Sequence, residues 1–201
     1  MAARMTNREW AITVAIAMLP ALPHAAPQAP AASWLDTSVS TNWNAPGSSV
    51  PTAPRMGEAA AAILKRCQMP ERRSTIAEQA VGSAGWTPFL IFDRELVNGD
   101  IEIIGGLAGA DGMCRPMAFN GFVFVGGRFA GTLAPGPMDS RTDGTLGAVR
   151  ILDANTVTAE FSRYTDRDAL CCPSSRVSVT YRIDRSAKGP LVAPTSSRAI
   201  R

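Results

Sequence analysis

The sequence predicts an α+β domain that is mainly an antiparallel β meander, folded as a sandwich or a curved sheet and stapled by disulfides, with one or two helices at its N-terminal side. Two-residue turns such as Asn98-Gly99 and Gly126-Gly127 separate apolar runs and are typical of β-hairpins. Residues 176–183 alternate between apolar and polar side chains, which indicates a strand with one buried face. Because hairpins join successive strands, antiparallel pairing is expected.

The first 25 residues have the layout of a secretory signal peptide. Arg4 and Arg8 form a basic region, and an apolar run occupies residues 10–19. Cleavage after Ala25 fits, because a small residue lies at the cut, and Ala29-Pro30-Ala31 is the alternative position. The run is shorter than the roughly 20 residues that a membrane-spanning helix needs. No Leu-x-x-Cys lipobox follows, since the first cysteine is Cys67. We therefore expect a periplasmic or secreted protein with no stable membrane anchor after signal cleavage.

Residues 26–55 are rich in proline, alanine and serine and show no periodicity, which predicts a disordered linker. We interpret its tryptophans, Trp34 and Trp43, as isolated aromatics of a mobile segment, with docking onto the domain as the alternative. A single domain is expected over residues 56–192. Its alanine-rich residues 57–67 end in basic side chains and predict a helix, and a second helix is expected over residues 71–80.

Strands are predicted from residue 86 onward. Apolar residues 89–92 precede the Asn98-Gly99 turn and a strand at 101–104, and the glycine-rich residues 105–112 are interpreted as a loop. Two further hairpins join residues 122–125 to 128–133 and residues 146–152 to 156–162. After the strand at 176–183, residues 193–201 are expected to form a frayed tail.

Charge and histidine content exclude several classes of function. The formal net charge is +3 and the basic residues are scattered, so nucleic acid is not predicted as a partner. The one histidine, His24, lies inside the predicted signal peptide, which leaves the mature chain without a histidine base or ligand. We predict no catalytic residues, no metal site and no cofactor. Carboxylates are the remaining acid–base option, with Glu95, Asp100 and Glu102 as candidates.

The four cysteines, Cys67, Cys114, Cys171 and Cys172, are predicted to form disulfides, because an even number in an exported chain indicates a disulfide framework. The favoured interpretation pairs Cys67 and Cys114 with Cys171 and Cys172 in one of the two cross arrangements, since adjacent strand residues point to opposite sides. The alternative bonds Cys171 to Cys172, although disulfide geometry disfavours such close Cα atoms. That bridge would serve as a rigid ligand platform or a redox switch.

A soft-metal site is a further candidate. Cysteine and methionine gather at residues 67–69 and 113–117, and their sulfur atoms suit Cu(I). Disulfide pairing and the filling of core gaps by methionine explain the same residues. A redox or copper-binding module centred on Cys171 and Cys172 is therefore the alternative to a binding function.

Three stretches resemble the LppP/LprE family of bacterial envelope proteins: FVFVGGRFAGTLAP (residues 122–135), PMDSRTDGTL (137–146) and DALCCPSSRVSVTYRI (168–183). The Cys-Cys-Pro-Ser run is the most specific part. The resemblance implies an exported envelope protein without a known activity, catalytic residue or cofactor. The family's mycobacterial members look like lipoproteins, and this chain departs from them in lacking the lipobox. We expect a non-enzymatic protein that binds an unidentified protein or envelope component.

Overall fold

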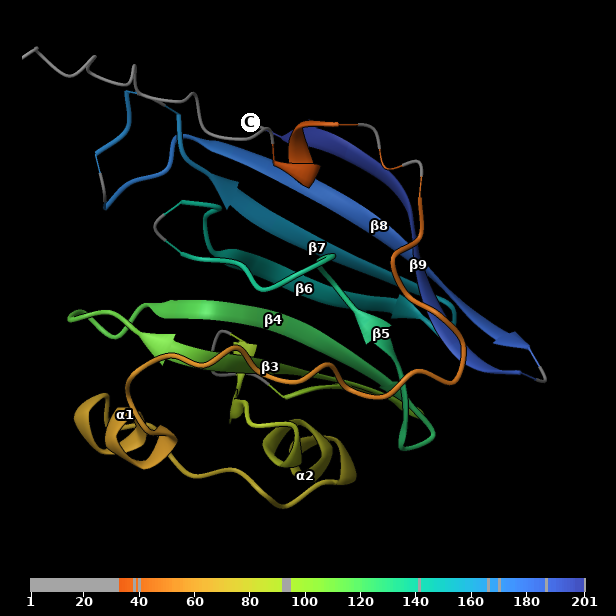
Figure 1. Ribbon diagram of the computed structural model, residues 1–201. Helices are drawn as coiled ribbons and strands as arrows, with labels where there is room; N and C mark the ends of the chain where they lie inside the picture. Colours follow the sequence, from red (N-terminus) through yellow and green to blue (C-terminus); the bar gives the residue numbers. More distant parts are fainter. Residues whose placement is uncertain are drawn as a thin grey trace, which may run out of the picture. The chain divides into compact units, whose positions relative to one another are not determined.

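The structure is a computed structural model that describes residues 33–37, 39, 41–91, 95–140, 142–165, 167–169, 171–186 and 188–200. The predicted signal peptide, residues 1–25, and the linker residues up to 32 lie outside these ranges. Two antiparallel sheets face each other in two layers (Figure 1). The predicted α+β class with mainly antiparallel strands is therefore confirmed.

The first sheet consists of β1 (Thr87–Phe89), β2 (Leu96–Asn98), β3 (Ile101–Ala110), β4 (Pro116–Val125) and β5 (Arg128–Thr132). Its order is β1-β3-β4-β5, and β2 pairs with another part of β3. The predicted turns are confirmed, since Asn98 is opposite Ile101 and Val125 is opposite Arg128. Gly126 and Gly127 both have positive φ, as a tight turn of this kind requires.

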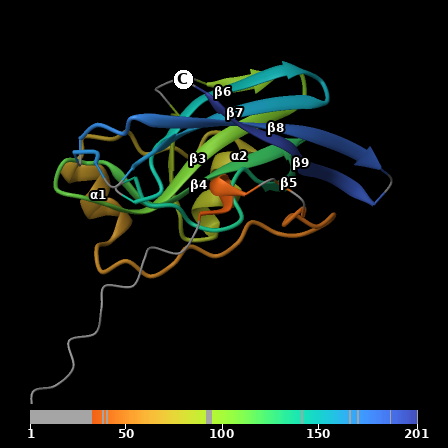
Figure 2. The same cartoon turned by 90° about the horizontal axis from the view of Figure 1, so that it is seen from above.

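The second sheet consists of β6 (Leu146–Asp153), β7 (Thr156–Arg163), β8 (Ser175–Ser186) and β9 (Gly189–Ile200), paired in chain order. The long strands β8 and β9 run together across the molecule (Figure 2). The sequence prediction of a frayed tail at residues 193–201 is wrong for its described part, because β9 pairs with β8 as far as Ile200. The polar side chains of this segment gave no sequence signal for a strand, because the strand is held by backbone pairing with β8.

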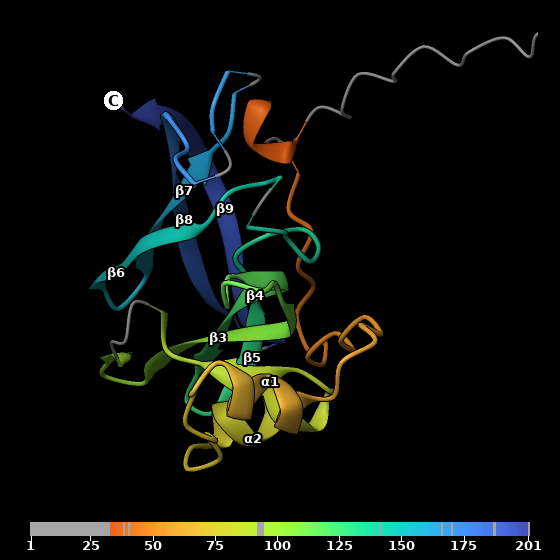
Figure 3. The ribbon, with the colours of Figure 1, turned by 90° about the vertical axis from the view of Figure 1, so that its left-hand side faces the viewer.

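Two helices, α1 (Ala60–Arg66) and α2 (Ile76–Ser83), cover the face of the first sheet that points away from the second (Figure 3). Both predicted helices are confirmed with shifted bounds. The second begins later than expected because Thr75 caps it, accepting the Glu78 N–H at 3.1 Å, while the Glu78 carboxylate accepts the Thr75 N–H at 3.2 Å.

The first sheet is buried on both faces, because the second sheet covers one and the helices cover the other. Along β3, Ile103 and Leu107 join the core between the sheets, whereas Ile104 and Ala108 pack on the helix side. Each large apolar side chain buried in this way stabilises the fold by about 1.5–3 kcal/mol. The central strands therefore read as nearly continuous apolar runs in the sequence.

The predicted loop at residues 105–112 is wrong, because β3 continues to Ala110. Its glycines permit close packing instead of a turn. A Cβ atom on Gly105 would lie 2.6 Å from the ring of Phe89, and one on Gly106 would lie 2.7 Å from the ring of Phe122. Glycine at these two positions lets aromatic side chains lie directly against the backbone of β3.

The described residues between Ser33 and Met56, here called the strap, run along the domain (Figure 1). The indole of Trp86 donates to the Pro51 carbonyl at 2.6 Å, and the Ala53 N–H donates to the Ala84 carbonyl at 2.9 Å. The assignment of residues 26–55 to a disordered linker is therefore wrong for this part. The alternative, that the tryptophans dock onto the domain, holds for Trp43 and for Trp34, which both pack against the core between the sheets.

Asn44 of the strap joins the edge strands of the two sheets, β5 and β9. Its amide nitrogen donates to the carbonyls of Thr132 and Val192, both at 3.0 Å, and its oxygen accepts the Thr132 N–H at 2.8 Å. Gly131 has a φ of +139°, and a Cβ atom there would overlap the Asn44 side chain. One side chain thus satisfies backbone groups that no neighbouring strand pairs.

Candidate functional site: the mouth at the end of the second sheet

The inner face of the second sheet changes character toward one end. Val177, Val179 and Tyr181 are buried, as the predicted alternation requires. Toward the end of this face Arg163 and Ser175 lie opposite each other on β7 and β8, and on β9 Ser197 lies opposite Val179. The apolar core therefore ends in a polar surface at this end of β7, β8 and β9.

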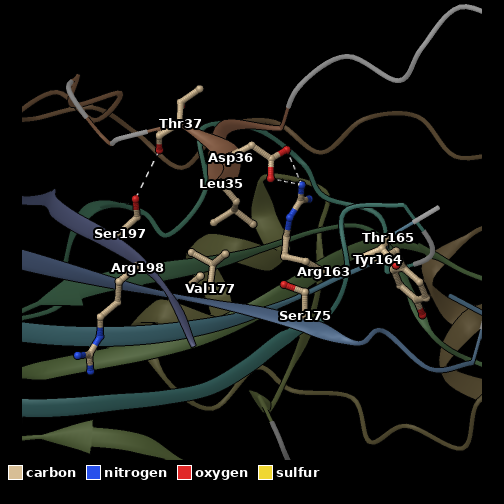
Figure 4. Close-up of a pocket in the computed structure, with 11 residues that line it drawn as sticks. Leu35, Asp36, Thr37, Arg163, Tyr164, Thr165, Ser175, Val177, Ser197 and Arg198 are labelled. Carbon is tan, nitrogen blue, oxygen red and sulfur yellow. Dashed lines mark hydrogen bonds and ion pairs between the residues drawn. The ribbon is translucent and has the colours of Figure 1, made fainter. Parts of the chain in front are cut away.

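A pocket of about 450 Å³ lies on this polar surface (Figure 4). Its lining comes from the N-terminal part of the strap and from the ends of three strands. We call it the mouth, and its residues are Leu35, Asp36, Thr37, Arg163, Tyr164, Thr165, Ser175, Val177, Ser197, Arg198 and Ala199. Hydroxyl groups and arginines supply most of its chemistry, so it suits a ligand with hydrogen-bonding groups.

An ion pair between Arg163 and Asp36 lies in the mouth (Figure 4). The Arg163 Nη2 atom lies 2.7 and 2.6 Å from the two carboxylate oxygens of Asp36. The Arg163 side chain is 13% exposed and that of Asp36 is 47% exposed, so the ion pair is open to solvent at Asp36. Asp36 belongs to the 3₁₀ turn η1 (Trp34–Asp36), which Ser33 caps, with the Ser33 N–H donating to Asp36 at 3.0 Å.

The β7–β8 loop, residues 164–174, forms the rim of the mouth. Its two ends are joined by Asp168, whose Oδ2 atom accepts the N–H groups of Thr165 at 2.7 Å and Ser174 at 3.0 Å. The N–H groups of Ser174 and Thr165 lower the pKa of the Asp168 carboxyl from 3.8 to about 2. The Asp168 carboxylate therefore orders the loop and is not suited to proton transfer.

The disulfides join Cys67 to Cys114 and Cys171 to Cys172. The predicted cross arrangement is wrong for a physical reason. Cys67 follows helix α1 beneath the first sheet, whereas the β7–β8 loop lies at the end of the second sheet, on the opposite side of the domain (Figures 1 and 3). The Cα atoms of Cys67 and Cys114 are 5.5 Å apart, within the usual range. The alternative pairing of Cys171 with Cys172 is the one present.

The other predicted candidates do not form a common site. Asp100 pairs with Arg185 at 2.6 Å, Glu102 accepts the Thr75 hydroxyl at 2.5 Å, and Glu95 lies 3.7 Å from Arg72. Within the described ranges, no three histidine, cysteine, aspartate or glutamate side chains are grouped to hold a metal ion. The sulfur atoms of Cys67 and Cys114, which the copper hypothesis offered as ligands, are bonded to each other.

Sequence reasoning missed Arg163 and Asp36 as site residues. They are 127 positions apart, and neither belongs to a catalytic motif. The run Ser33-Trp34-Leu35-Asp36 does match a capping box, which marks the start of a helical turn. That signal indicated ordered structure inside the predicted linker, although it did not indicate the partner of Asp36.

The comparisons with known proteins agree with the resemblance seen in the sequence. The model of the family described as LppP/LprE lipoprotein matches residues 102–186, from the start of β3 to the end of β8. No curated protein and no solved structure matches the chain significantly. In the part of the chain that the structure describes, no helix has the length and apolar character of a membrane span. A lipoprotein family is consistent with a protein of the cell envelope. Residues 102–186 are thus similar to the LppP/LprE lipoprotein family.

Proposed function

We propose that the chain is a non-enzymatic protein of the cell envelope that binds a protein or another envelope component at the mouth. The polar inner face at the end of the second sheet carries this proposal. Inner faces of packed sheets are normally filled with apolar side chains, but here Arg163, Ser175 and Ser197 line a pocket of about 450 Å³. Openings at the ends of β structures are common ligand sites.

The charges of the mouth favour a partner with an acidic group. Arg163 is largely buried and already binds one carboxylate, that of Asp36. A carboxylate or phosphate of a partner would compete with Asp36 for the same guanidinium group, which recognises such groups with short charge-assisted hydrogen bonds. The guanidinium of Arg198 points away from this pair (Figure 4), so Arg163 supplies the positive charge that faces the pocket.

The proposal of a binding role rather than catalysis rests on the acidic groups of this region. A general acid or base works best with a pKa near the working pH. The pKa of Asp168 is lowered to about 2, and Asp36 is paired with Arg163. With the one histidine of the sequence in the predicted signal peptide, the mouth is better suited to recognition than to proton transfer.

The expected location rests on two supports. Residues 1–25 have the layout of a signal peptide, and the matched family is one of lipoproteins. These supports favour the proposal that the folded domain lies in the periplasm or outside the cell. Its small and scattered positive charge gives no reason to propose a nucleic acid as partner.

Site-specific photo-crosslinking tests the proposed function. A photoreactive amino acid replaces Ser197, whose side chain lines the mouth, in cells that export the full chain. Ser196 is the matched control, because it precedes Ser197 on β9 and points to the other face of the sheet. We expect a discrete adduct from position 197 and none from position 196. Equal labelling at both positions, or adducts from position 196 alone, would contradict the proposal.

A second variant tests the role of the arginine. Replacing Arg163 with Gln keeps a hydrogen-bonding side chain but removes the charge that an acidic partner would bind. We expect the adduct from position 197 to fall by about tenfold, the equivalent of one charge-assisted hydrogen bond. An unchanged yield would show that the partner does not use Arg163.

A further inference from the structure

We propose that the Cys171–Cys172 bridge is a thiol-exchange site that accepts two electrons from a dithiol, and that its reduction loosens the rim of the mouth. This inference adds an activity to the chain and does not depend on the partner-binding proposal. Three observations support it. The Cys171–Cys172 bridge is exposed, whereas the Cys67–Cys114 bridge is partly buried, and hydrogen bonds connect the loop of the exposed bridge to the pocket.

Access distinguishes the two disulfides. Cys171 and Cys172 are both exposed on the β7–β8 loop. Cys67 and Cys114 are partly buried, and the guanidinium of Arg66 lies against Cys114, with its Nη1 atom 3.7 Å from the Cys114 sulfur and 2.8 Å from the Asp111 carbonyl. Thiol–disulfide exchange requires a thiolate to reach a sulfur atom, so the exposed bridge is the one that a reductant meets.

The consequences of reduction also differ between the bridges. The Cys67–Cys114 bond connects positions 47 residues apart, so breaking it removes a long-range cross-link. The Cys171–Cys172 bond joins neighbouring residues, whose Cα atoms are 3.8 Å apart in any case. Opening it therefore frees only the local backbone, and the domain keeps its sheets. A bridge of this kind can be reduced and reoxidised without unfolding the protein.

The exchange itself balances with a dithiol as the reductant. A thiolate of the dithiol attacks one sulfur of the bridge, forming a mixed disulfide while the other cysteine leaves as a thiolate and takes up a proton. The second thiol of the reductant then displaces the attached cysteine. The products are the free thiols of Cys171 and Cys172 and the disulfide of the reductant, so two electrons and two protons have moved to the protein.

Short hydrogen bonds connect the bridge to the mouth. Cys172 donates its N–H to the Ala169 carbonyl at 2.9 Å, and Ser174, two residues further on, donates to Asp168 at 3.0 Å. Asp168 also accepts the N–H of Thr165 at 2.7 Å. Thr165 in this loop and Ser175, which follows the loop as the first residue of β8, line the pocket. Freeing the backbone at residues 171–172 therefore acts on both sides of the mouth.

The test compares the two disulfides within one molecule. The folded protein is titrated with dithiothreitol as the dithiol, its free thiols are alkylated, and peptide mass spectrometry reports the reduced fraction of each bridge. We expect Cys171–Cys172 to be half-reduced at a dithiol concentration about tenfold lower than Cys67–Cys114. Reduction of both bridges in parallel, or of Cys67–Cys114 first, would overturn the exchange site.

Hydrogen exchange on the selectively reduced protein tests the effect on the mouth. We expect faster exchange of the amides at residues 164–175 and no change at residues 60–67 and 111–116, which flank the other bridge. The double variant Cys171→Ser with Cys172→Ser should reproduce the faster exchange without any reductant. Unchanged exchange at residues 164–175 in both preparations would overturn the coupling between the bridge and the mouth.

Discussion

Asn44 and Thr132 pair as two peptide groups would in a β-ladder. The Thr132 N–H donates to the Asn44 side-chain oxygen at 2.8 Å, and the Asn44 side-chain nitrogen donates back to the Thr132 carbonyl at 3.0 Å. The same nitrogen also donates to the Val192 carbonyl at 3.0 Å. An amide side chain is needed here, because the position requires a donor and an acceptor at once.

This relationship predicts a specific response to substitution at Asn44. Asn44→Ala should destabilise the domain by about 1–3 kcal/mol, because it removes the acceptor of the Thr132 N–H and the side-chain donor to the Val192 carbonyl. Asn44→Asp should be at least as harmful, since a carboxylate would face the carbonyl oxygens of Thr132 and Val192. Urea unfolding measures both changes. Asn42→Asp is the control, because its side chain serves as an acceptor for the Asn44 N–H and aspartate keeps that role. An Asn44→Asp variant with unchanged stability would contradict this role of the Asn44 amide.

Close packing at β3 predicts that Gly105 tolerates no side chain. Gly105→Ala places a Cβ atom 2.6 Å from the Phe89 ring, so the ring or the strand must move. We expect a loss of about 1–3 kcal/mol, as in other overpacked cores. Gly112→Ala is the matched control, since nothing lies within 4 Å of its Cβ position. Thermal unfolding of the two variants gives the comparison, and equal melting temperatures would show that Phe89 does not occupy this place.

The two disulfides should differ in their contribution to stability. Replacing Cys67 and Cys114 with Ala removes a cross-link over 47 residues and should cost about 2–4 kcal/mol. Replacing Cys171 and Cys172 with Ala should leave the free energy of unfolding nearly unchanged, because neighbouring residues close no loop in the unfolded chain. Denaturant unfolding of the two double variants measures the difference. A large loss from the second pair would contradict the local role given to that bridge.

The loop around Asp168 should stay ordered to unusually low pH. The N–H groups of Ser174 and Thr165 lower its pKa from 3.8 to about 2 in the folded protein. A lowered carboxyl pKa means that its stabilising contribution is fully present above the unfolded value and is lost as the pH falls through the folded one. An NMR titration should therefore show the Thr165 and Ser174 amide signals shifting with a midpoint near pH 2. Asp168→Asn should abolish that transition, and a midpoint near 3.8 would contradict the assignment.

Local patterns predicted much of the fold. The turns at Asn98-Gly99 and Gly126-Gly127 and the alternation of residues 176–183 depend on neighbours in the chain, and the structure contains them all. The strap and the end of β9 were missed because their order depends on distant contacts. Asn44 is fixed by Thr132 and Val192, and the polar residues of β9 pair through their backbones with β8. Composition alone made both segments look unstructured.

The candidate site was less accessible to sequence reasoning than the fold. The cysteines were identified as the chemically notable residues, but four cysteines allow three pairings and only the packing of α1 away from the β7–β8 loop decides among them. The Arg163–Asp36 pair brings together residues 127 positions apart. No periodicity or spacing in the sequence predicts a contact between residues so far apart.

The central claim is that the Cys171–Cys172 disulfide lies within the β7–β8 loop at the rim of the mouth. Disulfide mapping tests it most directly, by non-reducing peptide mass spectrometry on protein exported by the cell. The account predicts one peptide pair joined through Cys67 and Cys114 and one peptide holding an internal Cys171–Cys172 bond. Peptides that join Cys67 or Cys114 to either of the adjacent cysteines would contradict it.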